Sequence, residues 1–301
     1  MSTLKNKIDF ALVFTATNAN PNGDPLDGNR PRTDFTGRGE VSDVCLKRKI
    51  RNRIQDMGVD IFVQPDDRRA DEYRSLKDRA DNCPALIECA KKIKDKKASR
   101  DDYAAIAEKT WYDVRAFGQV FAFKDKKASG DEEGSDAVSI GIRGPVSIQA
   151  AFSCDPVNVT GTQITKSVNL ETGKDPDKKG SDTMGMKQRV DFGLYTTFGS
   201  INVKQAEKTG FSQEDAELLK KALLTLFVND ETSARPSGSM EVVKLVWWTH
   251  NCELGQYSPA KVHRSLRVSL NDGVVVPRSS DDYTIAVEPL PGLSFEELGD
   301  E

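Results

Sequence analysis

The sequence predicts an α+β fold, and three observations support this. Strand-like alternation occurs at residues 7–17 and 241–250, and amphipathic helices are expected at residues 42–57 and 211–230. In chain order the main elements run strand, helix, strand, strand, helix, strand, the order of a split βαβ unit with long insertions. At 301 residues the chain can bury a sizeable core, so we expect a single elaborated domain over residues 1–301.

A polar loop follows the first strand. Residues 20–25 read Asn-Pro-Asn-Gly-Asp-Pro, a succession of turn formers. Such a loop presents backbone N–H groups and the side-chain amides of Asn20 and Asn22, and Arg32 adds a cation. These groups are good partners for phosphates and for ribose 2′-hydroxyls, so the loop is a candidate nucleic-acid contact.

The helix after this loop has clear start and stop signals. Ser42 is the expected N-cap, and Gly58 is the expected stop just beyond the last turn. A helical wheel places the apolar residues in one narrow stripe, which predicts the face buried in the core. The stripe consists of Leu46, Ile50, Ile54 and Met57.

Cations border this stripe. Lys47 and Arg51 lie beside it and Arg48 extends the same side, whereas Lys49 and Arg53 are expected to point elsewhere. We expect no acid at i,i+4 spacing to neutralise the three bordering cations. They would then form a rigid row able to hold several phosphates. The alternative is an ordinary solvated basic face.

The remaining elements are predicted mostly from alternation, periodicity and turn residues. Residues 66–108 mix both signs of charge and are expected to form a solvated helical insertion. Trp111, Phe117 and Phe121 are expected in the core, on one face of a helix over 110–123. The other expected elements are a strand at 59–64, a strand over 137–153 interrupted at Gly144-Pro145, a strand at 190–202, short C-terminal strands at 262–270, 274–278 and 283–290, and a frayed acidic tail.

Two further cations are candidates for nucleic-acid contact. Arg143 lies within the interrupted strand, and the exposed face of an RRM-like sheet contacts RNA. Arg235 lies in a loop rich in Ser, Pro and Gly between the last predicted helix and strand. We therefore expect Arg143 on the sheet face and Arg235 at its edge.

Residues 155–189 have too few apolar side chains for a core of their own. Two short β-like pieces flank a tip rich in Gly, Asp and Lys, which predicts an extended, projecting hairpin. Lys166 and Lys187 could neutralise phosphates, while Met184 and Met186 offer apolar wedges for an unstacked base. The alternative is a surface loop without fixed structure.

Bulk properties limit the possible functions. The net charge of −4 argues mildly against nucleic-acid binding, although a total charge can hide a local basic groove. Five cysteines form no Cys-x-x-Cys motif, and the sequence lacks a signal peptide or long apolar run. We therefore expect reduced thiols in the cytoplasm and no membrane association. Only two histidines are present, which we expect to be structural, and we expect no metal or other cofactor.

The opening stretch carries a family resemblance. NPNGDPLDGNRPRTD (20–34), followed by VSDVCLKRKIRN (41–52), resembles the backbone subunit of the type I-C CRISPR Cascade complex, a member of the RAMP superfamily. Later segments agree with this resemblance. They are WYDVRAFGQVFA (111–122), SIGIRGPVSIQAAFS (139–153), ITKSVN (164–169), KQRVDFGLY (187–195) and NDETSARPSGSM (229–240).

The resemblance implies an RRM/ferredoxin-like palm in which residues 155–189 form the thumb, a β-hairpin that folds over RNA. It implies that several copies polymerise head to tail along one CRISPR RNA, which then pairs with target DNA. The processing RAMP subunit, the large subunit and the small subunit of Cascade would be further partners. It also implies that this subunit is not an enzyme.

Two other functions remain open from the sequence. One is a metal-dependent, RNA-guided ribonuclease that uses the aspartates Asp24, Asp34 or Asp43, because carboxylates near bound RNA could hold a catalytic metal. The other is a protein-interaction domain that binds no RNA.

Overall fold

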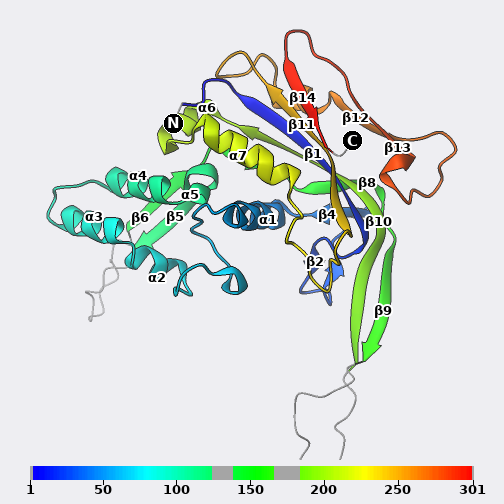
Figure 1. Cartoon of the computed structure of the whole chain (residues 1–301), viewed down its shortest axis with the longest axis horizontal. Coiled ribbons are helices and arrows are strands. Elements are labelled where there is room, and N and C mark those ends of the chain that lie inside the picture. Colours follow the sequence, from blue (N-terminus) through cyan, green and yellow to red (C-terminus); the bar gives the residue numbers. More distant parts are fainter. Residues whose placement is uncertain (1–2, 124–137, 166–183, 300–301) are drawn as a thin grey trace, which may run out of the picture.

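A large antiparallel sheet organises the molecule (Figure 1). We describe a computed structural model over residues 3–123, 138–165 and 184–299. Eight of the described strands belong to this sheet. They are β1 (Ile8–Ala19), β4 (Arg38–Val41), β7 (Val146–Ile148), β8 (Ala151–Pro156), β9 (Val159–Thr165), β10 (Met184–Ile201), β11 (Met240–Thr249) and β14 (Ser294–Leu298).

The middle of the sheet has the expected split βαβ topology. The strand order is β14-β11-β1-β10-β8-β4, and β7 and β9 also pair with β10. Strand β1 therefore lies between β10 and β11, with β8 beyond β10. This is the neighbour order of a ferredoxin-like unit whose four strands are β1, β8, β10 and β11. Helices α1 (Asp43–Asp56) and α7 (Gln213–Leu224) cover one face, so the predicted RRM/ferredoxin-like palm is confirmed.

The predicted strand at 59–64 is wrong. The second palm strand is β8, almost a hundred residues later. Residues 61–63 cannot pair as a strand because the N–H groups of Phe62 and Val63 donate to the carboxylate of Asp113, at 2.7 and 3.1 Å. Ile61 and Phe62 are nevertheless buried, which explains the apolar pattern.

Helix α1 follows its sequence signals closely. The Ser42 side chain accepts a hydrogen bond from the Cys45 N–H, and Gly58 has a φ of +81° just after the helix. The predicted stripe packs in the core between the helices and the sheet, with Leu46, Ile50 and Ile54 fully buried. Local signals were sufficient here because caps and periodicity are properties of neighbouring residues.

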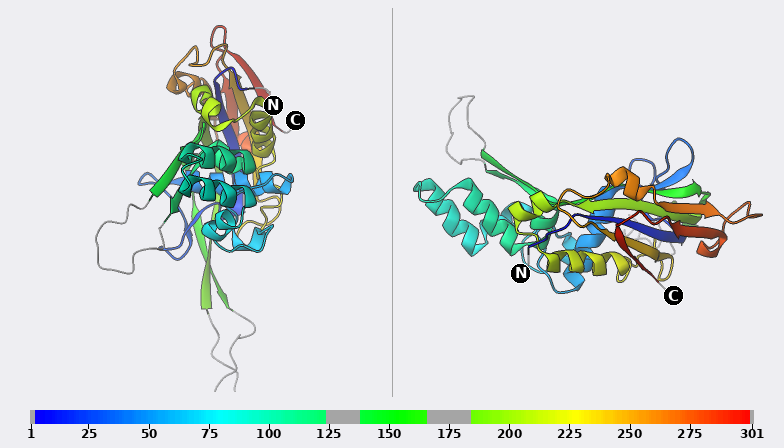
Figure 2. Two further views of the ribbon diagram at one scale, coloured as in Figure 1. Left: turned by 90° about the vertical axis from the view of Figure 1, so that its left-hand side faces the viewer. Right: turned by 90° about the horizontal axis from the view of Figure 1, so that it is seen from above.

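The other face of the sheet is also covered. Helix α8 (Pro259–His263), strand β12 (Leu266–Leu270) and strand β13 (Tyr283–Val287) form a second core there. Figure 2 shows α7 and this orange C-terminal segment on opposite sides of the sheet. The sheet therefore lacks the open face on which Arg143 was expected.

The C-terminal end differs from the sequence expectation. The acidic tail contains β14, which pairs with β11 at the edge of the sheet, and is not frayed there. Lys220 and Lys244 form ion pairs with Glu296 and Glu297, so charged residues are accommodated in this edge strand. The predicted strand at 274–278 is absent.

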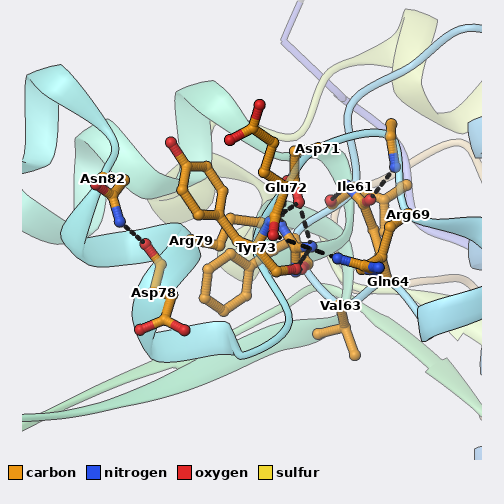
Figure 3. Close-up of polar contacts among 12 residues, drawn as sticks. Ile61, Val63, Gln64, Arg69, Asp71, Glu72, Tyr73, Asp78, Arg79 and Asn82 are labelled. Atoms are coloured by element: carbon orange, nitrogen blue, oxygen red, sulfur yellow. Dashed lines mark hydrogen bonds and ion pairs between the residues drawn. The ribbon is translucent and has the colours of Figure 1, made fainter.

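The predicted helical insertion packs in a small separate core that it shares with Phe62, Trp111, Val114, Phe121 and Ile140. Arg79 holds the start of this insertion in place. Its guanidinium donates to both carboxylate oxygens of Asp71 and to the carbonyls of Phe62 and Tyr73 (Figure 3). The helices of this region are η1 (Asp66–Arg68), α2 (Leu76–Asp81), α3 (Pro84–Lys94) and α4 (Arg100–Thr110).

The single helix predicted over 110–123 is wrong. Helix α5 (Tyr112–Phe117) ends at Gly118, whose φ is +81°, and the chain continues as strand β5 (Gly118–Phe123). A Cβ at Gly118 would lie 2.2 Å from the Ile142 carbonyl oxygen, so the close approach of the strands requires glycine. Trp111 and Phe121 are buried as predicted, and Phe117 is partly buried.

Strand β5 pairs with β6 (Val138–Arg143) in a separate two-stranded ribbon. The strand is interrupted after β6 at Gly144-Pro145, as predicted, and β7 and β8 follow. The remaining described elements are β2 (Gly23–Asp24), β3 (Arg30–Pro31), α6 (Val203–Thr209) and η2 (Ser280–Asp282). No helix in the described part of the chain is long and apolar enough to cross a membrane.

A hairpin stem projects from the body of the protein (Figure 1). Strand β9 pairs with the first part of β10 from Thr165 opposite Met184 to Val159 opposite Val190. The stem of the expected projecting hairpin is therefore present. Its tip, including the candidate Lys166, lies outside the described residues.

Candidate nucleic-acid interface

The Asn/Pro loop is held against the start of α1 by its own amides. The Asn22 side-chain oxygen accepts hydrogen bonds from the backbone N–H and the hydroxyl of Ser42, at 2.9 and 3.0 Å. The Asn20 amide donates to the Asn29 carbonyl at 2.6 Å, and Asn20 is almost fully buried. Both predicted contact residues therefore shape the loop.

The same loop meets the segment that contains Arg235. The backbone N–H of Asn20 donates to the Ala234 carbonyl at 2.9 Å. Arg235 in turn donates from Nε to Asp230 Oδ2 at 2.9 Å, and Asp230 also forms an ion pair with Lys49 of α1. Two segments separated by about two hundred residues in sequence thus lie side by side.

These contacts define a cationic cluster of Arg32, Lys49 and Arg235, with Asp230 at its centre. Arg32 joins from the loop, where it forms an ion pair with Asp24 at 3.3 Å. All three cations act on Cys45: burial raises the pKa of its thiol, while the charges of Lys49, Arg235 and Arg32 oppose this rise. Cations therefore outnumber acids where the loop, α1 and the Arg235 segment meet.

Sequence reasoning missed the role of Lys49. Its side chain is only 4% exposed and lies over the ring of Phe227, so it does not point into solvent. Burial lowers the pKa of the Lys49 ammonium, and the charge of Asp230 opposes that shift. The partner lies 181 residues further along the chain, so no helical periodicity could have revealed the pair.

The predicted row of free cations on α1 is not observed. Lys47 forms an i,i+4 ion pair with Asp43 at 3.0 Å, so the expectation that no such acid exists was wrong. Arg48 donates to the Val63 carbonyl at 2.7 Å. Both side chains are half-buried. Because the partner of Arg48 is a neutral backbone carbonyl, this hydrogen bond does not neutralise the charge of Arg48.

Arg51 is occupied more completely. Its Nε donates to Asp113 Oδ2 at 2.9 Å, and its guanidinium lies over the ring of Phe117, 5.1 Å from the centroid. Asp113 is 1% exposed. Arg51 therefore balances a buried carboxylate and is part of the scaffold.

Arg143 lies apart from the cationic cluster. It is exposed at the end of β6, in the ribbon with β5, and not in the palm sheet. Its guanidinium forms no hydrogen bond or ion pair with any residue within the described ranges.

The pairing register gives the hairpin stem two different faces. Residues directly opposite each other share a face, and the face alternates along each strand. Met184 and Met186 therefore lie on one face and are 66% and 56% exposed. Lys187 and Ile164 lie on the other face, which separates the predicted apolar wedges from the predicted phosphate contact.

The loop aspartates have separate structural partners. Asp34 Oδ1 accepts from the N–H groups of Thr36 and Arg38, and the hydrogen bond from the Thr36 hydroxyl is the main cause that lowers the pKa of Asp34. Asp24 pairs with Arg32 and Asp43 with Lys47. Among the described residues, no group of three or more His, Cys, Asp or Glu side chains is placed to hold a metal ion.

The two histidines pack around one buried aspartate. Nε2 of His250 lies 2.8 Å from Asp9 Oδ2, while His250 Nδ1 accepts from the Gln256 N–H. His263 stacks on the Phe198 ring with centroids 4.8 Å apart. Both histidines are therefore parts of the second core, as expected.

Three comparisons place the chain among known proteins. A relative from Haloferax volcanii, described as CRISPR-associated protein Cas7, is 29% identical over 257 residues, covering 79% of this chain and 68% of the relative. Two solved structures have lower similarity. A chain of a "CRISPR RNA-guided surveillance complex, pre-nicking" has 14% identity and a TM-score of 0.43, with 80% of this chain and 78% of that chain covered. A chain of a "CRISPR RNA-guided surveillance complex" has 16% identity and a TM-score of 0.42, with 80% and 68% covered.

The family model for CRISPR-associated protein Cas7 matches residues 6–288, a span that includes the palm, the helical insertion and both strands of the hairpin stem. Because this match covers most of the sequence, the chain belongs to the CRISPR-associated protein Cas7 family.

Proposed function

We propose that this protein is a non-enzymatic backbone subunit of a type I-C Cascade surveillance complex. Copies of the chain bind one CRISPR RNA, associate head to tail along it, and hold it for pairing with target DNA. The processing RAMP subunit and the large and small subunits complete the assembly. Family membership supports the proposal, and the resemblance of residues 20–52 favours type I-C.

The observation that carries RNA binding is the cationic cluster of Arg32, Lys49 and Arg235 at the edge of the palm. Asp230 neutralises only part of its charge. Asp230 binds Arg235 through Nε, and the other guanidinium N–H groups of Arg235 have no hydrogen-bond partner among the described residues. Guanidinium groups hold phosphates through several donors at once. We assign Arg32 and Arg235 of this cluster to the sugar-phosphate backbone, with Lys49 as the buried partner of Asp230.

The loop between β1 and α1 supplies the second part of the site. Asn20 and Asn22 fix its backbone, and contacts from a fixed backbone to phosphate and sugar carry little base information. Binding should therefore be largely independent of RNA sequence, and target choice is left to base pairing by the guide. Lys47 and Arg48 would add phosphate contacts at the adjoining surface of α1.

The methionine face of the hairpin supplies the third part. Met184 and Met186 are exposed on a stem that projects beyond the palm, and apolar side chains of this kind can separate stacked bases. We propose that this face displaces a base at each subunit boundary. Lys166, Arg143 and Lys187 are further candidate phosphate contacts outside this core site.

A nuclease-protection experiment tests the proposed function. The protein is purified from cells that express a CRISPR array, and any bound RNA is extracted and mapped. Guide-length RNA protected at even intervals is expected. If the preparation contains no RNA and the protein also fails to bind added guide at moderate salt, the proposal is wrong. Incubation of guide and complementary RNA with Mg²⁺ checks the enzymatic alternative, since regularly spaced cuts that disappear in Asp24→Ala would contradict a non-enzymatic role.

A further inference from the structure

We propose that Phe35 is a stacking platform for an unpaired nucleobase. Its side chain is 99% exposed in a tight turn of the loop between β1 and α1. The base that stacks on this ring could belong to the guide RNA or to a target DNA strand. This inference rests on the proposed binding of guide RNA and names a residue that holds a base beside the phosphate contacts.

The turn that carries Phe35 is rigid. The N–H of Asp34 donates to the Arg38 carbonyl at 2.8 Å, and the N–H of Gly37 donates to the Asp34 carbonyl at 3.1 Å. Asp34 Oδ1 accepts three further hydrogen bonds within the turn, two from Thr36 and one from the Arg38 N–H. A fixed backbone therefore presents the Phe35 ring to solvent, and little chain entropy is lost when a ligand covers it.

The turn lies between two parts of the proposed RNA site. Arg32 of the cationic cluster is three residues from Phe35, so their Cα atoms are at most about 11 Å apart. The Gly37 carbonyl accepts a hydrogen bond from the Val157 N–H at 3.0 Å, and Val157 lies between β8 and β9, at the root of the hairpin stem. A nucleotide whose phosphate is bound by Arg32 therefore has its base within reach of the Phe35 ring.

The surroundings of Phe35 favour a nucleobase over a protein partner. A stable protein interface buries roughly 800 Å² per partner around an apolar core. The neighbours of Phe35 in the turn are polar, and the exposed Leu26 belongs to a separate turn between β2 and β3. A lone exposed ring is instead typical of single-stranded nucleic-acid sites, where bases stack on aromatic side chains beside cations.

Two cations of the same loop are available to the neighbouring phosphates. Arg30 and Arg38 are exposed, and neither guanidinium forms a hydrogen bond or ion pair with a residue in the described ranges. The carboxylate of Asp34 is held by the turn through Oδ1. The loop thus offers an aromatic ring with cations on both sides of it in sequence.

Fluorescence of a Phe35→Trp variant tests the inference directly. Stacking on a base quenches an indole, and the native Trp111, Trp247 and Trp248 are almost fully buried, so the new ring should dominate the change on binding. Guide RNA alone should quench the variant if the base belongs to the guide. Quenching that begins only when complementary single-stranded DNA is added would assign the base to the target strand. Either result supports the proposed stacking.

Val275→Trp is the matched control for this measurement. Val275 is 89% exposed in the loop that follows β12, outside the proposed RNA site. An indole at this position is as accessible to solvent as one at position 35. Neither guide RNA nor target DNA should quench it.

Fluorescence anisotropy measures what the stacking contributes to affinity. Phe35→Ala should weaken binding of the ligand that supplies the base about fivefold or more. Phe35→Tyr should bind as the parent does, and Leu26→Ala, which removes an equally exposed apolar side chain from the neighbouring turn, should have no effect. The loss in Phe35→Ala should disappear on a ligand with an abasic site at the contacted position, because that ligand has no base to stack.

Three results would overturn the inference while the proposed function stands. The first is a parent that binds guide RNA together with a Phe35→Trp variant that neither guide nor target quenches. The second is a Phe35→Leu variant that binds as tightly as the parent, since an aliphatic side chain would then suffice. The third is a Phe35→Ala variant that binds short RNA normally but no longer assembles on guide-length RNA, which would assign the ring to a protein contact. A parent that binds no guide RNA would overturn the proposed function, and this inference with it.

Discussion

Arg51 donates from Nε to Oδ2 of Asp113 at 2.9 Å, and this ion pair joins α1 to α5, the helix that follows the helical insertion. The same carboxylate accepts the backbone N–H groups of Phe62 and Val63. A cation that the sequence placed at the RNA surface is therefore a structural element of the fold. The distinction matters for any experiment that reads RNA binding from charge reversal on α1.

Arg51→Glu is expected to destabilise the protein. It would place a second carboxylate beside the buried Asp113, and breaking a buried ion pair typically costs about 3–5 kcal/mol. Lys47→Glu, which alters a partly exposed i,i+4 pair, should cost about 1 kcal/mol or less. Urea denaturation of both variants measures the difference. Equal stabilities for the two proteins would show that the Arg51–Asp113 pair does not support the fold.

Arg32→Gln combined with Arg235→Gln should weaken RNA binding without unfolding the protein. Lys49 remains to balance Asp230, so the core of the cluster keeps its ion pair. If each arginine neutralises one phosphate of a single-stranded RNA, removing it should make the slope of log affinity against log salt shallower by about 0.7. Fluorescence anisotropy at several salt concentrations measures this slope.

Arg143→Gln is the matched control for that measurement, because Arg143 is exposed and lies on a separate ribbon. Its effect on affinity should be smaller than that of either cluster arginine. An unchanged salt slope in the Arg32/Arg235 double variant would show that the cluster does not bind phosphates.

Sequence signals identified the parts of the fold that depend on neighbouring residues. The cap, stripe and stop of α1 are examples. The helix predicted over 110–123 ends early, at Gly118. The sequence did not reveal this because the spacing of the aromatic residues there is compatible with either a helix or a strand. The second palm strand was predicted at residues 59–64 but is β8. Strand pairing depends on tertiary contacts, which local sequence signals do not specify.

The candidate site was predictable in composition but not in arrangement. Residues 20–25 and Arg235 were recognised as separate loop features, and only the fold shows that Lys49 and Asp230 bring them together. The two faces of the hairpin follow from a pairing register that a sequence with a polar tip does not specify. Long-range partners decide which cations remain available to a ligand.

Asp9 should contribute to the decrease in stability in acid. Burial acts to raise its pKa, but the hydrogen bonds from His250 and Lys7 outweigh burial, and the pKa of Asp9 lies below its ordinary value of 3.8. A carboxylate whose folded-state pKa is depressed stabilises the fold above the unfolded pKa. This contribution disappears as pH falls below about 3.8 towards the folded pKa.

The corresponding measurement is the unfolding free energy against pH for the parent and for Asp9→Asn. Between the two pKa values of Asp9, the parent should lose up to about 1.4 kcal/mol more per pH unit than the variant. Asp272→Asn, at an exposed site, should follow the parent profile. A parent and Asp9→Asn with parallel profiles below pH 4 would mean that Asp9 does not take part in acid unfolding.

Met184→Ser combined with Met186→Ser should remove base displacement while leaving most of the affinity. These side chains lie on the methionine face of the stem and contribute apolar volume without charge. Guide RNA with 2-aminopurine at successive positions reports unstacking as increased fluorescence. The parent should show increases at regular intervals, the double variant should lack them, and its affinity should fall only about threefold, roughly 0.7 kcal/mol. Lys187→Gln, on the opposite face, should keep the periodic signal because it leaves the wedge intact. A periodic signal that survives in the double-serine variant would assign base displacement to other residues of the hairpin.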